Sequence, residues 1–125
     1  MKTCKLTGIS LDWAVSKCEG YTLTTDGVSQ LVKKNEKSQV LGSYTTDQGI
    51  PYGYSPSSRW EQGGPIVERE RIILGYINNL SCAKFNVQGH NALEFGQTPL
   101  VAAMRCYVAS KLGSEVEVPR ELISI

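Results

Sequence analysis

The side chains that could support acid–base or nucleophilic chemistry are few and scattered along this chain. Its single histidine, His90, lies in the polar run Gly89-His90-Asn91, with no nucleophile or carboxylate beside it. A catalytic histidine needs such partners within hydrogen-bond reach, and they can come from distant parts of a fold. The sequence thus leaves catalysis open without evidence for it. We expect no enzymatic activity and no cofactor, and we name no catalytic residue.

The four cysteines form neither a redox motif nor a metal-binding motif. They are far apart and no two share a C-x-x-C spacing: Cys4, Cys18, Cys82 and Cys106. Combined with His90 they have no zinc-ligand spacing, so we predict no metal site. The N-terminus has no apolar export signal and no segment is apolar enough to span a bilayer. We therefore expect reduced thiols, a cytoplasmic location and no membrane contact.

The bulk composition is that of an ordinary globular protein. The chain has 125 residues, of which 41% are hydrophobic and 20% charged, and its formal net charge is +1. This length suits one domain with its own core. The small net charge excludes a globally basic nucleic-acid binder, although a local basic patch remains open. The short lysine run at 33–37 is interpreted as a solvated connection.

Aromatic and cationic residues gather on and beside a long loop, predicted over residues 46–58. This segment has two Pro, two Gly and two Tyr and no periodicity. The candidate binding residues here are Tyr52, Tyr54, Arg59 and Trp60. Such sets can stack on nucleic-acid bases, but the same rings can also fold back over the core. We favour the second interpretation because stacking platforms usually lie in a basic groove.

A helix over Pro99–Leu112 has a start and an end that the sequence specifies. Thr98 is the expected N-cap, Pro99 fits the first helical position, and Gly113 can close the last turn. One face carries large apolar residues and the other small ones, whereas a surface helix would carry charges there. The small face could support a homodimer or pack within the chain. The candidate self-association residues are Ala102, Cys106, Ala109 and Ser110.

A second helix is predicted from Gly8 to Glu19, with Thr7 as N-cap and Leu6 and Leu11 as a hydrophobic staple. Leu11, Ala14, Val15 and Cys18 share a face and are predicted core. Ile9 and Trp13 lie on roughly the opposite side. We interpret Ile9 and Trp13 as a candidate binding surface.

The remaining strands are expected in two hairpins. The first pairs 21–25 with 28–32 around Asp26-Gly27, and 39–45 is a candidate third strand. The second pairs 72–77 with 80–87.

Its turn is Asn78-Asn79, since Asn tolerates positive φ. Residues 88–97 are predicted to be a polar loop. Residues 115–118 alternate like an edge strand before Pro119, and 119–125 form a tail.

Between the hairpins, Arg59–Gln62 could form a helical turn that Gly63-Gly64 interrupts, and Pro65 could restart a short helix. Free N–H groups at the two glycines could bind an anion. The predicted fold is a single α+β domain over residues 1–125. Its order is helix–hairpin–helix–hairpin–helix, with both hairpins in one antiparallel sheet packed with about three helices.

Three segments of the chain carry motifs that occur together in a known family. They are Leu6-Thr7-Gly8 with Leu11-Asp12-Trp13-Ala14-Val15 and Lys17-Cys18-Glu19-Gly20; Tyr54-Ser55-Pro56-Ser57 with Trp60, Gln62-Gly63-Gly64-Pro65-Ile66 and Glu68-Arg69-Glu70; and Thr98-Pro99-Leu100-Val101-Ala102-Ala103-Met104-Arg105 with Val108-Ala109-Ser110-Lys111-Leu112-Gly113 and Glu115-Val116-Glu117-Val118-Pro119. With these motifs the chain resembles the NinX-like family of small, uncharacterised proteins of lambdoid phages and prophages. Arg59 stands where that pattern has an acidic residue. The resemblance implies a phage or prophage origin and a location in the host cytoplasm, and it supplies no catalytic residue.

These observations favour a non-enzymatic phage accessory protein that binds another protein. Its expected contact surfaces are Ile9 with Trp13, and the segment from Tyr52 to Trp60. The alternative is a nucleic-acid-associated protein of phage replication or recombination. That alternative requires the lysines and Arg59 to converge on one face.

Overall fold

A computed structural model describes residues 1–20, 22–25, 31–34, 40–44, 55–87 and 90–118. For residues 22–25, 31–34 and 40–44, and for Ile9, Asn86, Val87 and His90, it describes the backbone alone. The elements, in chain order, are η1 Thr3–Lys5, α1 Gly8–Cys18, β1 Thr22–Thr25, β2 Leu31–Lys34, β3 Val40–Tyr44, α2 Trp60–Glu70, β4 Ile73–Ile77, β5 Leu80–Val87, β6 His90–Gly96 and α3 Pro99–Leu112. The α+β class and the single small domain are confirmed.

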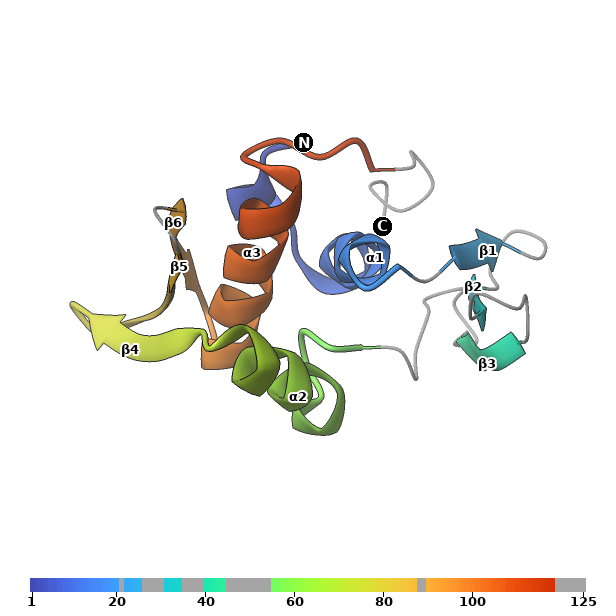
Figure 1. The fold of residues 1–125 in the computed structure, drawn as a ribbon, viewed down its shortest axis with the longest axis horizontal. Helices are drawn as coiled ribbons and strands as arrows, with labels where there is room; N and C mark the ends of the chain where they lie inside the picture. Colours follow the sequence, from blue (N-terminus) through green and yellow to red (C-terminus); the bar gives the residue numbers. More distant parts are fainter. Residues whose placement is uncertain (21, 26–30, 35–39, 45–54, 88–89, 119–125) are drawn as a thin grey trace.

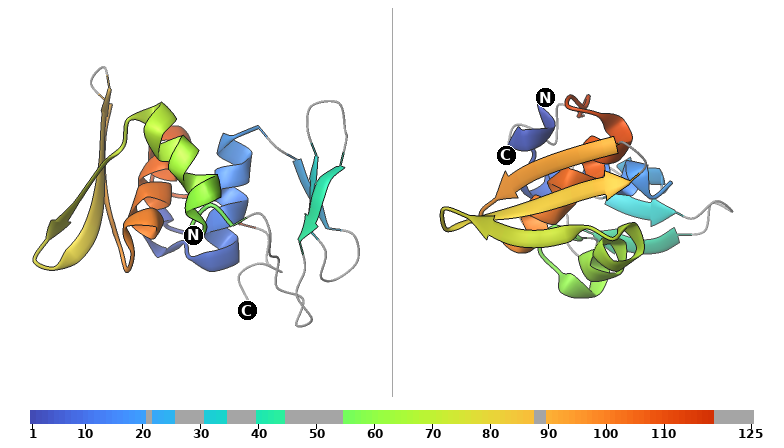
Figure 2. Two further views of the ribbon diagram at one scale, coloured as in Figure 1. Left: turned by 90° about the horizontal axis from the view of Figure 1, so that it is seen from below. Right: turned by 60° about the vertical axis from the view of Figure 1, so that its left-hand side comes forward.

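The strands form two antiparallel sheets, in the orders β1-β2-β3 and β4-β5-β6. The two predicted hairpins therefore do not share one sheet. Figures 1 and 2 show the reason: α3 and α1 lie between the two sheets, so the edge strands of one sheet cannot pair with those of the other. The layers follow one another as β4–β6, α3 with α2 beside it, α1, and then β1–β3.

α3 is the central element, and it contacts η1, α1, α2 and all three strands of the β4–β6 sheet. Its predicted N-cap is present, because the Thr98 hydroxyl accepts the Val101 N–H at 3.1 Å. Gly113, at φ 88°, ends the helix. Half of the helix is fully or almost fully buried: Leu100, Ala102, Ala103, Met104, Cys106, Tyr107 and Val108.

α1 begins and ends close to its predicted bounds. At its start Ser10 bonds back to Thr7: its hydroxyl donates to the Thr7 carbonyl at 2.8 Å and accepts the Thr7 N–H at 3.2 Å. Leu6 and Leu11, the predicted staple, are both fully buried in the main core. At the other end Gly20 has φ 78°, a left-handed conformation that a glycine adopts without strain.

The β4–β5 hairpin turns at Asn78 and Asn79, whose φ angles of 52° and 65° are both positive, as predicted. The prediction of a polar loop over 88–97 was wrong, because residues 90–96 form β6, which pairs with β5 along its length. Because most residues of this segment are polar, its alternation of core-facing and outward-facing residues was not evident in the sequence. Ala92 packs against the core, and Leu93 is exposed on the other face.

α2 runs unbroken through Gly63-Gly64-Pro65, so the predicted interruption is wrong. Gly63 is buried, and a Cβ atom there would lie 2.6 Å from Leu100 Cδ1. The glycine thus lets α2 lie close against α3. Because these glycines lie inside a helix, they also form no separate loop for an anion.

The first sheet and the chain ends differ from expectation in detail. β2 is described over Leu31–Lys34, and residues 28–30 of the predicted strand lie outside the described residues, while β3 matches the predicted third strand. The Asp26-Gly27 turn lies outside the described residues. In place of an edge strand over 115–118, a single bridge joins Glu115 to Lys2. Beside it, the Val116 N–H donates to the Met1 carbonyl at 2.8 Å.

Candidate binding surfaces

The start of α2 exposes the first candidate binding surface, formed by Arg59 and Trp60. Trp60, the first residue of the helix, is 51% exposed. Arg59 is exposed beside it, with its guanidinium 3.6 Å from the Glu61 carboxylate. Tryptophan and arginine are the residue types most enriched at energetically dominant positions of protein interfaces. This surface therefore has the composition of a contact site.

A turn anchored on α1 holds this surface in place. The Arg59 N–H donates to the Ser55 carbonyl at 2.8 Å, and the Ser57 N–H donates to Asp12 Oδ1 of α1 at 2.8 Å. Burial raises the pKa of Asp12 to about 6, while the hydrogen bonds from Ser57 act to lower it. Trp60 is thus exposed on an ordered support. Tyr52 and Tyr54 lie outside the described residues.

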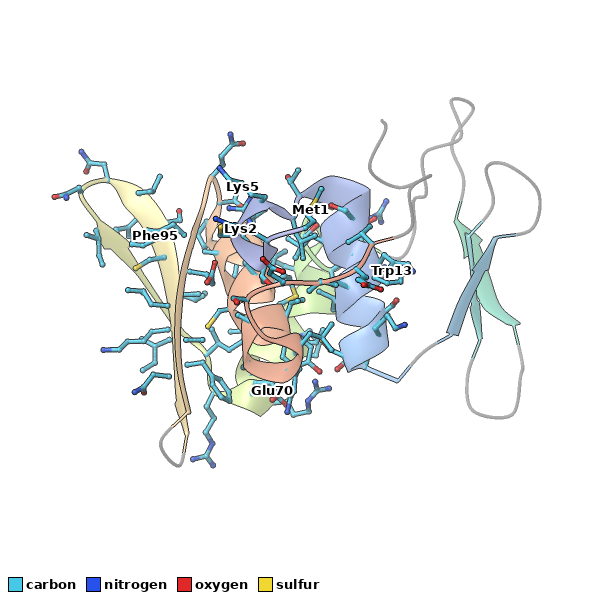
Figure 3. The ribbon with its side chains drawn as sticks, turned by 90° about the horizontal axis from the view of Figure 1, so that it is seen from above. Met1, Lys2, Lys5, Trp13, Glu70 and Phe95 are labelled. Carbon is cyan, nitrogen blue, oxygen red and sulfur yellow. The ribbon has the colours of Figure 1, made fainter. Side chains whose placement is uncertain are left out.

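The surface predicted on α1 is described only through Trp13, which is half-buried and packs against the core. The ammonium group of Lys17 lies 5.0 Å from the centroid of its ring. Figure 3 places Trp13 on the side of α1 away from α3. The side chain of Ile9 is not among those described. Trp13 therefore offers a smaller exposed area than Trp60.

The small-residue face of α3 is largely covered within the chain. Ala102 and Cys106 are fully buried, and the Cys106 thiol lies 3.6 Å from the Ala92 carbonyl of β6. Ala109 and Ser110 are partly exposed. This arrangement agrees with the interpretation that the face packs within the chain. It leaves little of the helix for a second copy.

A second exposed surface was not recognised in the sequence: the outer face of the β4–β6 sheet. Five large apolar side chains there are between 37% and 61% exposed: Ile73, Ile77, Leu80, Leu93 and Phe95. Figure 3 shows Phe95 on the side of the sheet away from α3. Nothing in the described part of the chain covers this face. Strand β6 supplies two of the five residues, and it had been predicted as a loop.

The exposure of this face is energetically significant. Burying a Leu, Ile or Phe side chain completely contributes ~1.5–3 kcal/mol, so covering a half-exposed one contributes ~1 kcal/mol. Contiguous apolar patches of a few hundred Å² on small proteins are frequently functional. We call this surface the outer sheet face.

A polar cluster joins the three helices. The Arg69 guanidinium donates to both Glu19 carboxylate oxygens, at 3.1 and 2.6 Å, and the Tyr107 hydroxyl donates to Glu19 Oε2 at 2.6 Å. Arg69 also donates to Glu70 at 2.8 Å. The Glu19 carboxylate is thus held by a cation from α2 and a hydroxyl from α3, and we call Glu19, Arg69 and Tyr107 the clamp.

The described residues offer little for catalysis. They contain no cluster of three or more His, Cys, Asp or Glu that could hold a metal ion. Burial raises the pKa of Cys18 and of Cys106 to about 12, so neither thiol ionises near neutral pH. The side chain of His90 lies outside the description.

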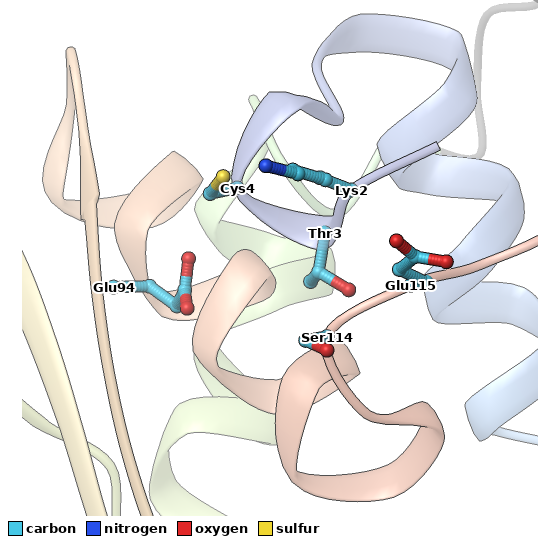
Figure 4. A pocket seen from close by; sticks show the side chains of 6 residues that line it. All are labelled: Lys2, Thr3, Cys4, Glu94, Ser114 and Glu115. Carbon is cyan, nitrogen blue, oxygen red and sulfur yellow. The ribbon is translucent and has the colours of Figure 1, made fainter.

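A hollow of about 310 Å³ lies between the N-terminus, β6 and the end of α3 (Figure 4). Its charged lining residues are Lys2, Glu94 and Glu115. One ammonium group faces two carboxyl groups, and burial raises the pKa of Glu94. The lining therefore carries charges of both signs rather than a concentration of one sign.

A family model described as "Bacteriophage P22, NinX" matches residues 2–111 of the chain. No curated protein matches it. No helix among the described residues is long and apolar enough to cross a membrane.

Proposed function

The chain belongs to the NinX family of phage proteins, and from this premise we propose that it is a non-enzymatic accessory protein that binds another protein in the host cytoplasm. The observation that supports this proposal is the half-exposed indole of Trp60 beside Arg59 at the start of α2. An exposed tryptophan on an ordered support loses little side-chain entropy on binding. Trp60 is the proposed anchor, and Arg59, with Trp13, Ile9, Tyr52 and Tyr54, completes the set of candidate contact residues.

Quantitative pull-downs from phage-infected host lysate test this proposal. The tagged chain is compared with Trp60→Ala and with Tyr76→Ala as a matched control, because Tyr76 is also an exposed aromatic but lies on β4. We expect at least one protein to be recovered with the chain and with Tyr76→Ala, and lost with Trp60→Ala. Identical recovery with all three proteins would contradict the role of Trp60.

Binding of nucleic acid is the alternative function. Arg59 is the cation beside Trp60, and its charge is partly offset by Glu61 at 3.6 Å. Bases stacking on an exposed indole would quench its fluorescence. We expect no quenching when single-stranded DNA or RNA is added at low salt. Quenching that disappears in Trp60→Phe would favour the alternative.

A further inference from the structure

On the outer sheet face, a small residue on one side of the middle strand is matched by a large residue on the other side. Strand pairing places Gly75, Cys82 and Phe95 in one row across β4, β5 and β6. The adjacent row on the same face is Ile73, Lys84 and Leu93. Phe95, which is 37% exposed, and Gly75, which has no side chain, therefore flank Cys82 at similar distances.

This row has the form that a two-fold interface requires. In an isologous contact, if residue i of one copy contacts residue j of the other, then j also contacts i. A two-fold axis parallel to β5 and passing over Cys82 places β4 of one copy opposite β6 of the other. Phe95 then meets the partner's Gly75, and Ile73 meets the partner's Leu93. The same operation repeats both contacts with the copies exchanged.

We propose that the outer sheet face binds a second copy of this chain, forming a two-fold dimer in which two sheets pack face to face and each Phe95 ring occupies the space over the partner's Gly75. Face-to-face packing of antiparallel sheets is a common way to cover an apolar sheet face. The proposal does not depend on the proposed function, whose contact residues lie elsewhere.

The size of the face favours a weak dimer. Three strands about 4.8 Å apart, with a rise of about 3.4 Å per residue over seven residues, give a flat area of roughly 300 Å². Because the side chains project from the sheet, the accessible area exceeds this flat area and approaches the ~600 Å² that each partner contributes to the smallest specific interfaces. We therefore expect a weak dimer that dissociates on dilution.

Charge provides a feature that identifies this dimer. Lys84 is the one charged residue in the two rows, and the two-fold axis brings it opposite the partner's Lys84. Like charges facing one another oppose association, although long lysine side chains can extend to the rim of an interface. A partner protein of another kind would instead be expected to pair Lys84 with a carboxylate. Removing the Lys84 charge should therefore strengthen the dimer, whereas it should weaken a complex with a different protein that pairs a carboxylate with Lys84.

Sedimentation velocity of the full chain from about 1 to about 500 µM tests the proposal. The decisive variant is Gly75→Val, whose Cβ would lie 3.9 Å from Cys82 Sγ, an ordinary contact that leaves the fold intact. The change makes the face more apolar but fills the space that Phe95 needs. We expect Gly75→Val to weaken the dimer at least about tenfold. If the apolar face associated without a defined geometry, the added apolar side chain would instead strengthen the association.

Two further variants complete the experiment. Lys84→Leu should tighten the dimer about tenfold, and Tyr76→Val, on the other face of β4, should leave it unchanged. The double variant Gly75→Phe/Phe95→Ala exchanges the large and small positions and should restore dimerisation. Circular dichroism confirms folding of each variant. A wild-type chain that stays monomeric at the highest concentration would overturn the proposal, as would undiminished association of Gly75→Val.

Discussion

At the residue scale, Asp12 is the group with the clearest energetic consequence. Its side chain is 9% exposed, and burial raises its pKa to about 6, while the Ser57 hydrogen bonds stabilise the ionised form without cancelling that effect. An unfolded aspartate has a pKa of about 3.9. Between these two values the folded protein binds more protons than the unfolded chain. The free energy of unfolding therefore falls as the pH rises from about 4 to about 6.

The substitution Asp12→Asn should remove this pH dependence. The amide oxygen of Asn can still accept the Ser57 N–H that Asp12 Oδ1 accepts at 2.8 Å, and Asn does not ionise. We expect equal stabilities of the two proteins at pH 4, and a variant more stable by up to about 3 kcal/mol at pH 8. Urea denaturation across this pH range measures both curves. A variant that keeps the wild-type slope would assign the pH dependence to another group.

Single residues also show where sequence reasoning succeeds and fails. The Thr98 cap and the left-handed Asn78-Asn79 turn were predicted because both depend on neighbours in the chain. The burial of Asp12 was not predicted. Its burial depends on Ser57, which lies 45 residues away in the sequence. No local pattern contains that contact.

At the element scale, the two adjacent glycines of α2 have different environments. A Cβ on Gly63 would overlap the Pro56 carbonyl oxygen and lie 2.6 Å from Leu100 Cδ1, whereas a Cβ on Gly64 would lie 3.6 Å from the Trp60 ring. The first is a steric conflict with backbone, and the second is an ordinary contact.

Alanine at these two positions should therefore change stability in opposite directions. Gly63→Ala forces α2 away from α3 and should cost about 1–3 kcal/mol. Gly64→Ala gains helix propensity and should stabilise by up to about 1 kcal/mol. Thermal unfolding of the two variants beside the wild type measures the difference. Equal effects would contradict the close approach of the two helices at Gly63.

β6 is the element that sequence reasoning missed, and Arg105 of α3 helps to hold it. The Arg105 guanidinium donates to the Phe95 carbonyl at the end of β6 at 2.7 Å, and to the Leu6 carbonyl at 2.8 Å. Residues 88–97 contain few strongly apolar residues, so their periodicity was weak. Their strand conformation depends on pairing with β5 and packing on α3, which a local pattern cannot reveal.

Replacing Arg105 with Met should leave both carbonyls without this donor. We expect a loss of about 1–3 kcal/mol in the free energy of unfolding. Lys111→Met is the matched control, because the Lys111 ammonium lies 3.5 Å from Glu70 in an exposed ion pair and should contribute less than about 1 kcal/mol. Chemical denaturation measures the loss in the free energy of unfolding for Arg105→Met and for Lys111→Met. A control as destabilised as Arg105→Met would mean that the two backbone contacts are unimportant.

At the scale of the whole molecule, the clamp of Glu19, Arg69 and Tyr107 ties α1, α2 and α3 together. Tyr107 donates to Glu19 at 2.6 Å and accepts from Arg69 at 3.1 Å. None of these pairs is close in sequence, so no local pattern of the chain predicts them. The fold class followed from the sequence, whereas the contacts that fix the helices relative to one another did not.

Tyr107→Phe should destabilise the protein by about 1–2 kcal/mol by removing both hydrogen bonds. The same change should cost measurably less in a Glu19→Gln background, because the charged acceptor is already gone. A double-mutant cycle by urea denaturation gives the coupling energy, which we expect to be about 1 kcal/mol. Additive effects would mean that the hydroxyl and the carboxylate act independently.

The position of α3 in the chain also determines when the protein can acquire its structure during synthesis. α3 covers one face of the β4–β6 sheet and one side of α1, yet it follows every other helix and strand in the sequence. While the ribosome is still translating it, both apolar surfaces lack their cover, and exposed surfaces of this kind make nascent chains prone to aggregation. The core that α3 shares with the β4–β6 sheet and α1 can therefore close only after α3 has emerged from the exit tunnel.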